Sequence, residues 1–166
     1  MKAIAAIAVV VLVLDQVTKA MALRLLEPGR PVPVIDGFFS LTLVMNPGLA
    51  FGMLGQTPPG WRWVVALLSM VALVVLLVLA MRMVPAGGPL SILALGLVFG
   101  GAVGNLIDRG RFGAVVDFLD FYWRGYHWPA FNVADSGISV GVTLLALRMV
   151  FPGEPASDAR AADRGA

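Results

Sequence analysis

The chain has 166 residues, which is about the length of one domain. Hydrophobic residues make up 59% of it, charged residues make up 13%, and the mean hydropathy is +0.89. Soluble domains average about 45–50% and about 25% respectively, so this composition excludes a disordered chain and favours an integral membrane protein. The net charge is only +2, and Lys and Arg do not cluster, so the sequence gives no indication of nucleic-acid binding.

Cysteine and histidine usage narrows the chemistry further. The chain has no cysteine, which excludes disulfides, zinc held by Cys, iron–sulfur clusters and a cysteine nucleophile. Its single histidine, His127, argues against a His-based metal or haem site. We therefore expect no cofactor and no metal.

Four stretches are long and apolar enough to cross a bilayer, which needs about 20 helical residues. They cover about 4–23, 62–81, 90–107 and 133–151. The first stretch is open to a second interpretation as a signal peptide, because Ala20-Met21-Ala22 resembles a cleavage site. The polar segment 15–19 lies between the apolar run and that site, which argues against cleavage.

The aromatic residues indicate how the spans are arranged. All four Trp and both Tyr precede either the second or the fourth span, and these rings collect at membrane–water interfaces. In a four-span chain both positions lie on one side of the membrane. Lys and Arg are divided almost evenly between the two sides, so they do not indicate the orientation.

The connections differ in character. Residues 24–60 form a long loop in which 39–45 alternate large apolar and smaller residues, a pattern typical of a short β-strand. Residues 108–132 mix charges with aromatic rings, and we expect an interfacial segment there. The tail 152–166 is predicted to be disordered, which leaves a single membrane domain over 1–151.

Polar residues gather on the aromatic side of the predicted bundle. Charged groups at membrane depth are costly, so each is a functional candidate. The side chains that lie on this side are Asp15, Lys19, Asn46, Asn105, Asp108, Arg109, Asp117, Asp120, Asn132 and Asp135. A polar cluster at one rim of a helix bundle favours an active site at the membrane interface.

Several of these residues also have purely structural explanations. Asp15 and Lys19 are four residues apart and can pair on one helix face. Asp108 and Arg109 fit a cap at the end of the third span, and Asp120 fits a solvated loop charge. Asp135 is harder to explain in this way, because it lies in an apolar span without a basic neighbour in sequence.

Two further motifs fit ordinary structural roles. Asn46-Pro47-Gly48 is a common turn signal. Gly100, Gly101 and Gly104 have the small-residue spacing that lets membrane helices pack closely.

Paired aspartates indicate one reaction in particular. Two carboxylates in a half-buried site share one proton, so one can activate water while the other hydrogen-bonds a scissile carbonyl. This is metal-free aspartic peptide hydrolysis. The residues alone do not decide which two Asp side chains form the pair.

Other functions stay open at this point. Ser136 with Lys19 fits a serine–lysine hydrolase, and four Asp carboxylates (Asp15, Asp108, Asp117 and Asp135) fit a metal-dependent one. A proton-coupled transporter would also use intramembrane charges, although these acids gather at one rim and do not trace a path across the bilayer. A structural membrane subunit would need no such cluster.

Five motifs in order resemble the lipoprotein signal peptidases, or signal peptidase II, over roughly residues 4–151. They are Asp15-Gln16-Val17-Thr18-Lys19, Asn46-Pro47-Gly48-Leu49-Ala50-Phe51, Gly104-Asn105-Leu106-Ile107-Asp108-Arg109, Val115-Val116-Asp117-Phe118 and Phe131-Asn132-Val133-Ala134-Asp135. Each motif is weak alone, but the ordered set in a cysteine-free chain of this length is specific.

The resemblance implies a membrane all-α fold with four transmembrane helices and a small β-rich extracytoplasmic element at about 24–60. It implies that Asp117 and Asp135 form a catalytic dyad. It further implies two groups of assisting residues. Those that would position the substrate are Asn46, Gly48, Asn105, Arg109, Asn132 and Ala134, and those that would support the site are Asp15, Lys19, Gly101, Gly104 and Asp108.

The resemblance also implies partners and location. The substrate would be a prolipoprotein whose cysteine carries diacylglyceryl, cleaved just before that cysteine. The chain would lie in the bacterial cytoplasmic membrane among its lipids, with both termini cytoplasmic and the site near the extracytoplasmic face. We expect a monomer.

Overall fold

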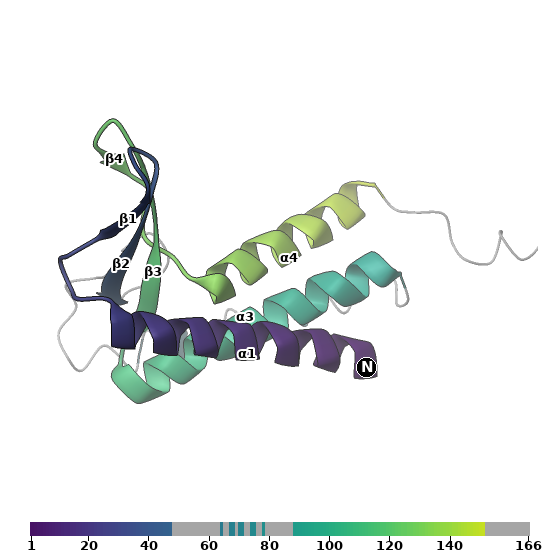
Figure 1. The fold of residues 1–166 in the computed structure, drawn as a ribbon. Helices are drawn as coiled ribbons and strands as arrows, with labels where there is room; N and C mark the ends of the chain where they lie inside the picture. Colours follow the sequence, from purple (N-terminus) through teal and green to yellow (C-terminus); the bar gives the residue numbers. More distant parts are fainter. Residues whose placement is uncertain are drawn as a thin grey trace, which may run out of the picture.

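A computed structural model of the chain describes residues 1–47 and 88–151, together with individual residues between 64 and 78. Its elements, in chain order, are α1 (Lys2–Leu25), β1 (Val32–Ile35), β2 (Phe39–Asn46), α3 (Pro89–Phe112), β3 (Val115–Trp123), β4 (Tyr126–His127) and α4 (Val133–Val150) (Figure 1). Apart from those individual residues, the predicted span at 62–81 lies outside the described residues, as do Gly48 and the tail 152–166.

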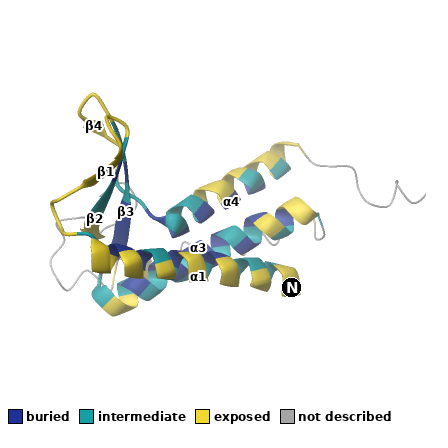
Figure 2. Cartoon of the chain, viewed as in Figure 1, coloured by how far each residue is buried: buried dark blue, intermediate teal, exposed yellow. Residues whose placement is uncertain are grey.

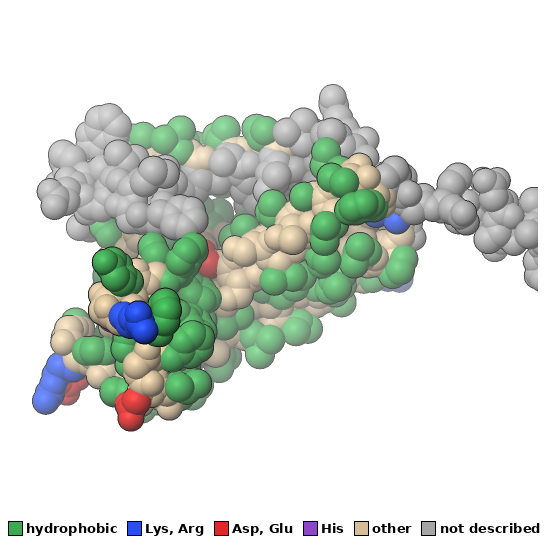
Figure 3. Space-filling model, turned by 90° about the horizontal axis from the view of Figure 1, so that it is seen from above, with side chains coloured by type: hydrophobic (Ala, Val, Ile, Leu, Met, Phe, Trp, Pro, Cys, Tyr) green, Lys and Arg blue, Asp and Glu red, His purple; other side chains and the backbone are tan. Residues whose placement is uncertain are grey.

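Three of the described helices are long and apolar enough to cross a bilayer. α1 and α3 have 24 residues each and α4 has 18, so at about 1.5 Å per residue each covers most or all of a hydrocarbon core about 30 Å thick. Hydrophobic side chains cover much of the visible face of the bundle, as a lipid-facing surface requires (Figure 3). The predicted spans at 4–23, 90–107 and 133–151 are confirmed as helices. The predicted span at 62–81 stays a prediction, because most of it lies outside the described residues.

Small residues let α3 pack closely against both of its neighbours. A Cβ added at Gly100 would overlap the backbone of Ala8 in α1, and one added at Gly101 would overlap the carbonyl of Ala134 in α4. The glycine spacing thus marks helix contacts, as predicted. Beyond these glycines, a small apolar core forms around Ala94 and Val98.

The sheet is antiparallel, with strand order β1-β2-β3-β4. The predicted strand at 39–45 is confirmed as β2, but the prediction that confined the β element to 24–60 is wrong, because β3 and β4 come from the segment expected to be merely interfacial. The first four residues of β3 are buried, Val115 to Phe118. A strand buried on both faces lacks the alternating pattern that reveals a half-exposed strand.

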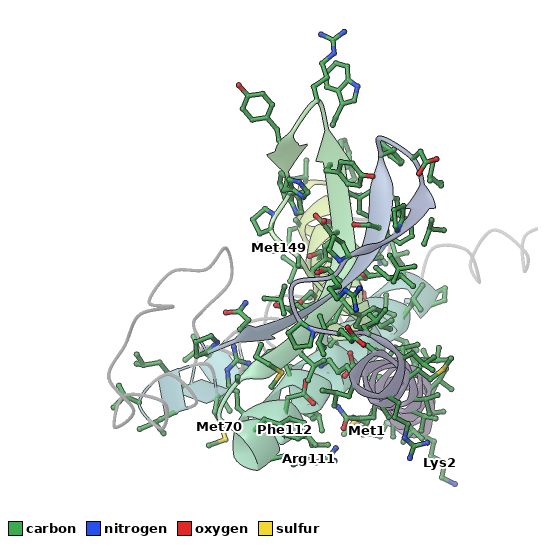
Figure 4. The ribbon with its side chains drawn as sticks, turned by 60° about the vertical axis from the view of Figure 1, so that its left-hand side comes forward. Met1, Lys2, Met70, Arg111, Phe112 and Met149 are labelled. Carbon is green, nitrogen blue, oxygen red and sulfur yellow. The ribbon has the colours of Figure 1, made fainter. Side chains whose placement is uncertain are left out.

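The sheet lies across one end of the helices and projects beyond them (Figure 1). In a second view the tip of the sheet points away from the end of α3, where Arg111 and Phe112 are labelled (Figure 4). Buried residues concentrate on β3 and on the facing sides of the helices (Figure 2). Many of the buried residues at the sheet end are polar, so the candidate functional site lies at this end.

Candidate active site

A buried lysine lies at the centre of the polar cluster. Lys19 is only 2% exposed, and its Nζ lies 2.9 Å from Asp15 Oδ2, 2.8 Å from Asp108 Oδ2 and 2.9 Å from Asn105 Oδ1. An ammonium carries three protons, so all of them are engaged. The predicted pairing of Asp15 with Lys19 is confirmed, and the ion pair with Asp108 joins α1 to α3.

The two carboxylates of this cluster extend it to the other elements. Asp15 Oδ1 accepts from the backbone N–H of Ala134 at 2.9 Å, which ties α1 to the start of α4. Asp108 Oδ2 accepts from the backbone N–H of Val116 at 3.2 Å, which ties α3 to β3. Asp108 is therefore not the simple helix cap that its position at the end of the span suggested.

Gln16 completes the cluster and was not singled out from the sequence. Its Nε2 lies 3.1 Å from Asp108 Oδ1 and 3.2 Å from Asp15 Oδ2, so it donates between the two carboxylates. The only sequence signal for this role is its place between Asp15 and Lys19. Adjacent residues on a helix do not share a face, and this made Gln16 easy to overlook.

Asn105 connects Lys19 to Asp135 by hydrogen bonds. Its Oδ1 accepts from Lys19 and, at 3.2 Å, from Asn132 Nδ2. Because an ammonium only donates, the atom of Asn105 that faces Lys19 is the oxygen, and the amide nitrogen faces the other way. Asn105 Nδ2 donates to Asp135 Oδ1 at 2.7 Å.

Asn132 begins α4 and connects both candidate catalytic aspartates. Its side-chain oxygen accepts from the backbone N–H of Asp135 at 2.9 Å, and Asp135 Oδ2 accepts from the backbone N–H of Asn132 at 3.3 Å. This reciprocal capping box fixes the Asp135 carboxylate at the helix start. Asn132 Nδ2 donates to Asp117 Oδ1 at 2.7 Å, and the side chain is completely buried.

Asp117 lies on β3 and is 2% exposed. Besides Asn132, it accepts from Asn46 Nδ2 at 3.0 Å, so residues of β2 and α4 hold its two oxygens. Burial and, next, the negative charge of Asp135 raise the pKa of Asp117 from 3.8 to about 7, against the hydrogen bonds and the charge of Lys19 that lower it. A carboxyl group with this pKa is present in both protonation states near neutral pH.

The raised pKa predicts how stability depends on pH. The unfolded chain releases the Asp117 proton near pH 4, whereas the folded protein keeps it to about pH 7. The folded state thus binds more protons in this window, so stability falls as pH rises through it and levels off above. We expect the melting temperature of wild type to fall from pH 4.5 to 8 relative to that of Asp117→Asn, by the equivalent of a few kcal/mol. If the difference in melting temperature between wild type and Asp117→Asn did not change with pH, this prediction would be contradicted.

Three more of the predicted residues contact members of the polar cluster, namely Gly104, Arg109 and Ala134. Ala134 is fully buried, and Gly104 leaves the space that Asp15 occupies, because a Cβ at this glycine would overlap the Asp15 carboxylate. Arg109 lies one turn after Asn105 on α3, and its Nη1 is 3.4 Å from the Asn105 carbonyl oxygen. Small residues here allow three elements to meet around buried polar groups.

The serine–lysine alternative does not fit the geometry. Ser136 Oγ donates to the Asn132 carbonyl at 3.0 Å, and every proton of Lys19 is engaged elsewhere. We expect Ser136→Ala to change kcat/KM of peptide cleavage by less than about threefold, because loss of one hydrogen bond within a helix is a small perturbation. Loss of more than a hundredfold, in a variant with unchanged melting temperature, would bring the serine back into consideration.

The metal-dependent alternative also lacks a suitable donor set. Asp15 and Asp108 already accept from Lys19, from Gln16 and from backbone N–H groups. Within the described ranges, no group of three or more His, Asp and Glu side chains has the arrangement of a metal site.

Asp120 is not the solvated loop charge that was predicted. It is 7% exposed, accepts from Ser40 Oγ at 3.1 Å and lies 3.0 Å from His127 Nδ1. β2 and β4 bring these partners to one face of the sheet, where Ser40 is paired with Asp120 in the strand register. This face is opposite to that of Asp117, because side chains alternate along a strand.

Comparisons with known proteins identify the family of the chain. Residues 7–151 match the family model for signal peptidase (SPase) II. The chain is 50% identical over 139 residues to the lipoprotein signal peptidase of Geobacter sulfurreducens, covering 84% of this chain and 86% of that one. It is 45% identical over 146 residues to that of Desulforapulum autotrophicum, covering 87% and 90%.

Solved structures give the same result. Two structures of bacterial membrane enzymes each align with a TM-score of 0.73, at 33% and 31% identity. The first alignment covers 90% of this chain and 88% of the other, and the second covers 92% and 96%. The chain therefore belongs to the signal peptidase II family of bacterial membrane peptidases.

Proposed function

We propose that this protein is an aspartic endopeptidase that removes the signal peptide from diacylglyceryl-modified prolipoproteins, cleaving just before the lipidated cysteine. The relatives that it matches are lipoprotein signal peptidases. The observation that supports the chemistry is the joining of Asp117 and Asp135 through the buried side chains of Asn132 and Asn105. Aspartic peptide hydrolysis uses two carboxylates joined in this way and needs no other reactive group.

In this mechanism Asp117 and Asp135 share one proton. The ionised carboxylate takes a proton from water as the water oxygen attacks the scissile carbonyl carbon. The protonated carboxyl donates to the carbonyl oxygen, which gives a neutral tetrahedral intermediate. As the C–N bond breaks, the protonated carboxyl gives its proton to the departing amine. The ionised carboxylate takes a proton from a hydroxyl of the intermediate, so the pair again holds one proton. The pKa of Asp117 near 7 suits both roles at neutral pH.

The surrounding amides act as positioning residues. Asn46, Asn105 and Asn132 each donate to one of the two carboxylates, which fixes where the oxygens point. In the proposal Arg109, Gly48 and Ala134 contact the peptide and the lipid-bearing residue. In the proposal a second group of residues supports the site by holding the helices together. This group consists of the ion cluster Asp15, Lys19 and Asp108 and the helix-contact glycines Gly101 and Gly104.

The position of the site suits a membrane-anchored substrate. Asp117 lies on β3 and Asp135 in the first turn of α4, and the sheet lies across this end of the helices (Figure 1). Trp123 and Tyr126 are 65% and 85% exposed and are paired in the strand register, and Trp123 is on the same face of β3 as Asp117. Exposed Trp and Tyr favour the headgroup region. A lipid-bearing peptide that diffuses within the bilayer would reach such a site directly.

The proposal includes the arrangement in the cell. The protein would be a monomeric, multi-pass protein of the cytoplasmic membrane, with residues 1–151 as a single peptidase domain. The site would lie near the extracytoplasmic face and both termini in the cytoplasm.

The decisive experiment uses purified protein in detergent and a prolipoprotein with or without its diacylglyceryl group. We expect a gel shift only with the lipidated substrate, and the same rate with and without chelator. Cleavage that stops with chelator would refute the metal-free mechanism. Equal cleavage of the unlipidated form would refute the substrate assignment.

A further inference from the structure

A second polar feature lies at the end of the bundle opposite to the candidate active site. Here the first turn of α3 meets the last turn of α4, and the amino terminus of α1 is nearby (Figure 1). α3 begins after Gly88 without a side-chain cap, and its first residue is Pro89. The positive end of the α3 dipole thus carries no side-chain acceptor.

Two buried polar atoms at this end have no hydrogen-bond partner in the described part of the chain. They are Ser91 Oγ and Arg148 Nε, and Ser91 is only 4% exposed. Both side chains approach Gly88: a Cβ built there would lie 3.3 Å from Arg148 Nη2 and 3.9 Å from Ser91 Oγ. A hydroxyl and a guanidinium therefore converge on the space beside a glycine at a helix start.

The electrostatics of this space favour an anion. The segments that meet here, residues 2–8, 88–95 and 144–151, contain no Asp or Glu, so none of them supplies a carboxylate for Arg148. Lys2 adds positive charge at the same end. The position of Arg148 in the last turn of α4 is explained by the dipole of that helix. The dipole does not explain the unpartnered hydroxyl of Ser91.

We infer that Gly88, Ser91 and Arg148 form a binding site for the phosphate group of a phospholipid in the leaflet at this end of the bundle. A guanidinium and a hydroxyl are donors that typically bind phosphate, and the dipole at a helix start favours an anion. The ends of membrane-spanning helices lie at headgroup depth, where a phospholipid presents its phosphate. A lipid bound here would hold α3 and α4 together at the end farthest from the ion cluster of Asp15, Lys19 and Asp108.

The test is native mass spectrometry of the full chain, titrated with three probes. These are phosphatidylglycerol, diacylglycerol with the same acyl chains, and inorganic phosphate. We expect wild type to retain phosphatidylglycerol at least tenfold more tightly than diacylglycerol, which lacks the phosphate. Equal retention of the two lipids would overturn the inference. Displacement of phosphatidylglycerol by millimolar inorganic phosphate would reassign the site to a free anion and overturn the lipid assignment.

Variants separate this site from general attraction to anionic lipid. Arg148→Gln is expected to weaken phosphatidylglycerol retention at least tenfold. Gly88→Ala should do the same by placing a methyl group in the site, and its backbone angles (φ −80°, ψ 141°) suit any residue. Arg30→Gln removes the same charge from an exposed position and should bind as wild type does. Wild-type retention in either site variant that folds would refute the inference, so Gly88→Ala provides the test even if Arg148→Gln does not fold.

Discussion

Asp117→Asn and Asp135→Asn are each expected to lower kcat/KM of prolipoprotein cleavage by about 10²–10⁴-fold, which is the range for loss of a general acid or base. Asparagine has nearly the shape of aspartate but neither takes nor gives a proton at neutral pH. With only one carboxylate left, the acid and base roles cannot be divided. The measurement is initial cleavage rate against substrate concentration, for proteins of confirmed folding.

The chain offers a matched control on the same strand. Asp120→Asn makes the same substitution three residues along β3, at a carboxylate that is also buried but lies on the opposite face of the strand with Ser40 and His127. We expect it to keep most of the activity. If Asp120→Asn lost as much activity as Asp117→Asn, the loss would reflect damage to the sheet. If either dyad variant kept more than a tenth of the wild-type rate, the assignment would fail.

The sequence predicted the parts of this site that depend on local spacing. The pairing of Asp15 with Lys19 follows from a separation of four residues on a helix. The start of the last helix was also predicted, at Val133. At these positions the chemistry of nearby residues decides the structure.

The parts that sequence patterns missed depend on contacts between distant segments. The ion pair of Lys19 with Asp108 joins residues on α1 and α3, and only the packing of the two helices brings them together. β3 was missed because its buried half shows no alternation, and Asp120 was misjudged because its partners come from β2 and β4. The family motifs identified these residues as a group, but spacing alone did not show which of them make contact.

Lys19→Met is expected to have the largest effect on stability, with a loss of about 3–5 kcal/mol in the free energy of unfolding. Breaking a buried ion pair from one side leaves the other charges without compensation. Here the lysine lies between Asp15 and Asp108, which are both almost fully buried, so its removal leaves two carboxylates facing each other. Methionine fills a similar volume, and the effect would therefore arise from charge and not from a cavity.

The exposed ion pair of Arg30 with Glu27 is the matched control. Its N–O distance is 2.7 Å, shorter than either distance in the buried cluster, but its side chains are 79% and 68% exposed. Exposed pairs contribute about 0–1 kcal/mol, so Arg30→Met should scarcely change unfolding in detergent. Equal effects of the two variants would mean that the buried cluster contributes no more to stability than a surface pair.

A second substitution distinguishes charge repulsion from loss of position. Adding Asp108→Asn to Lys19→Met removes one of the two opposed carboxylates, so we expect part of the lost stability to return. Activity should not return with it, because Asn105 has then lost the donor that orients its amide towards Asp135. Stability and catalysis would thus separate in one pair of variants. That result would show that the lysine cluster both neutralises buried charge and aligns one carboxylate of the proposed dyad.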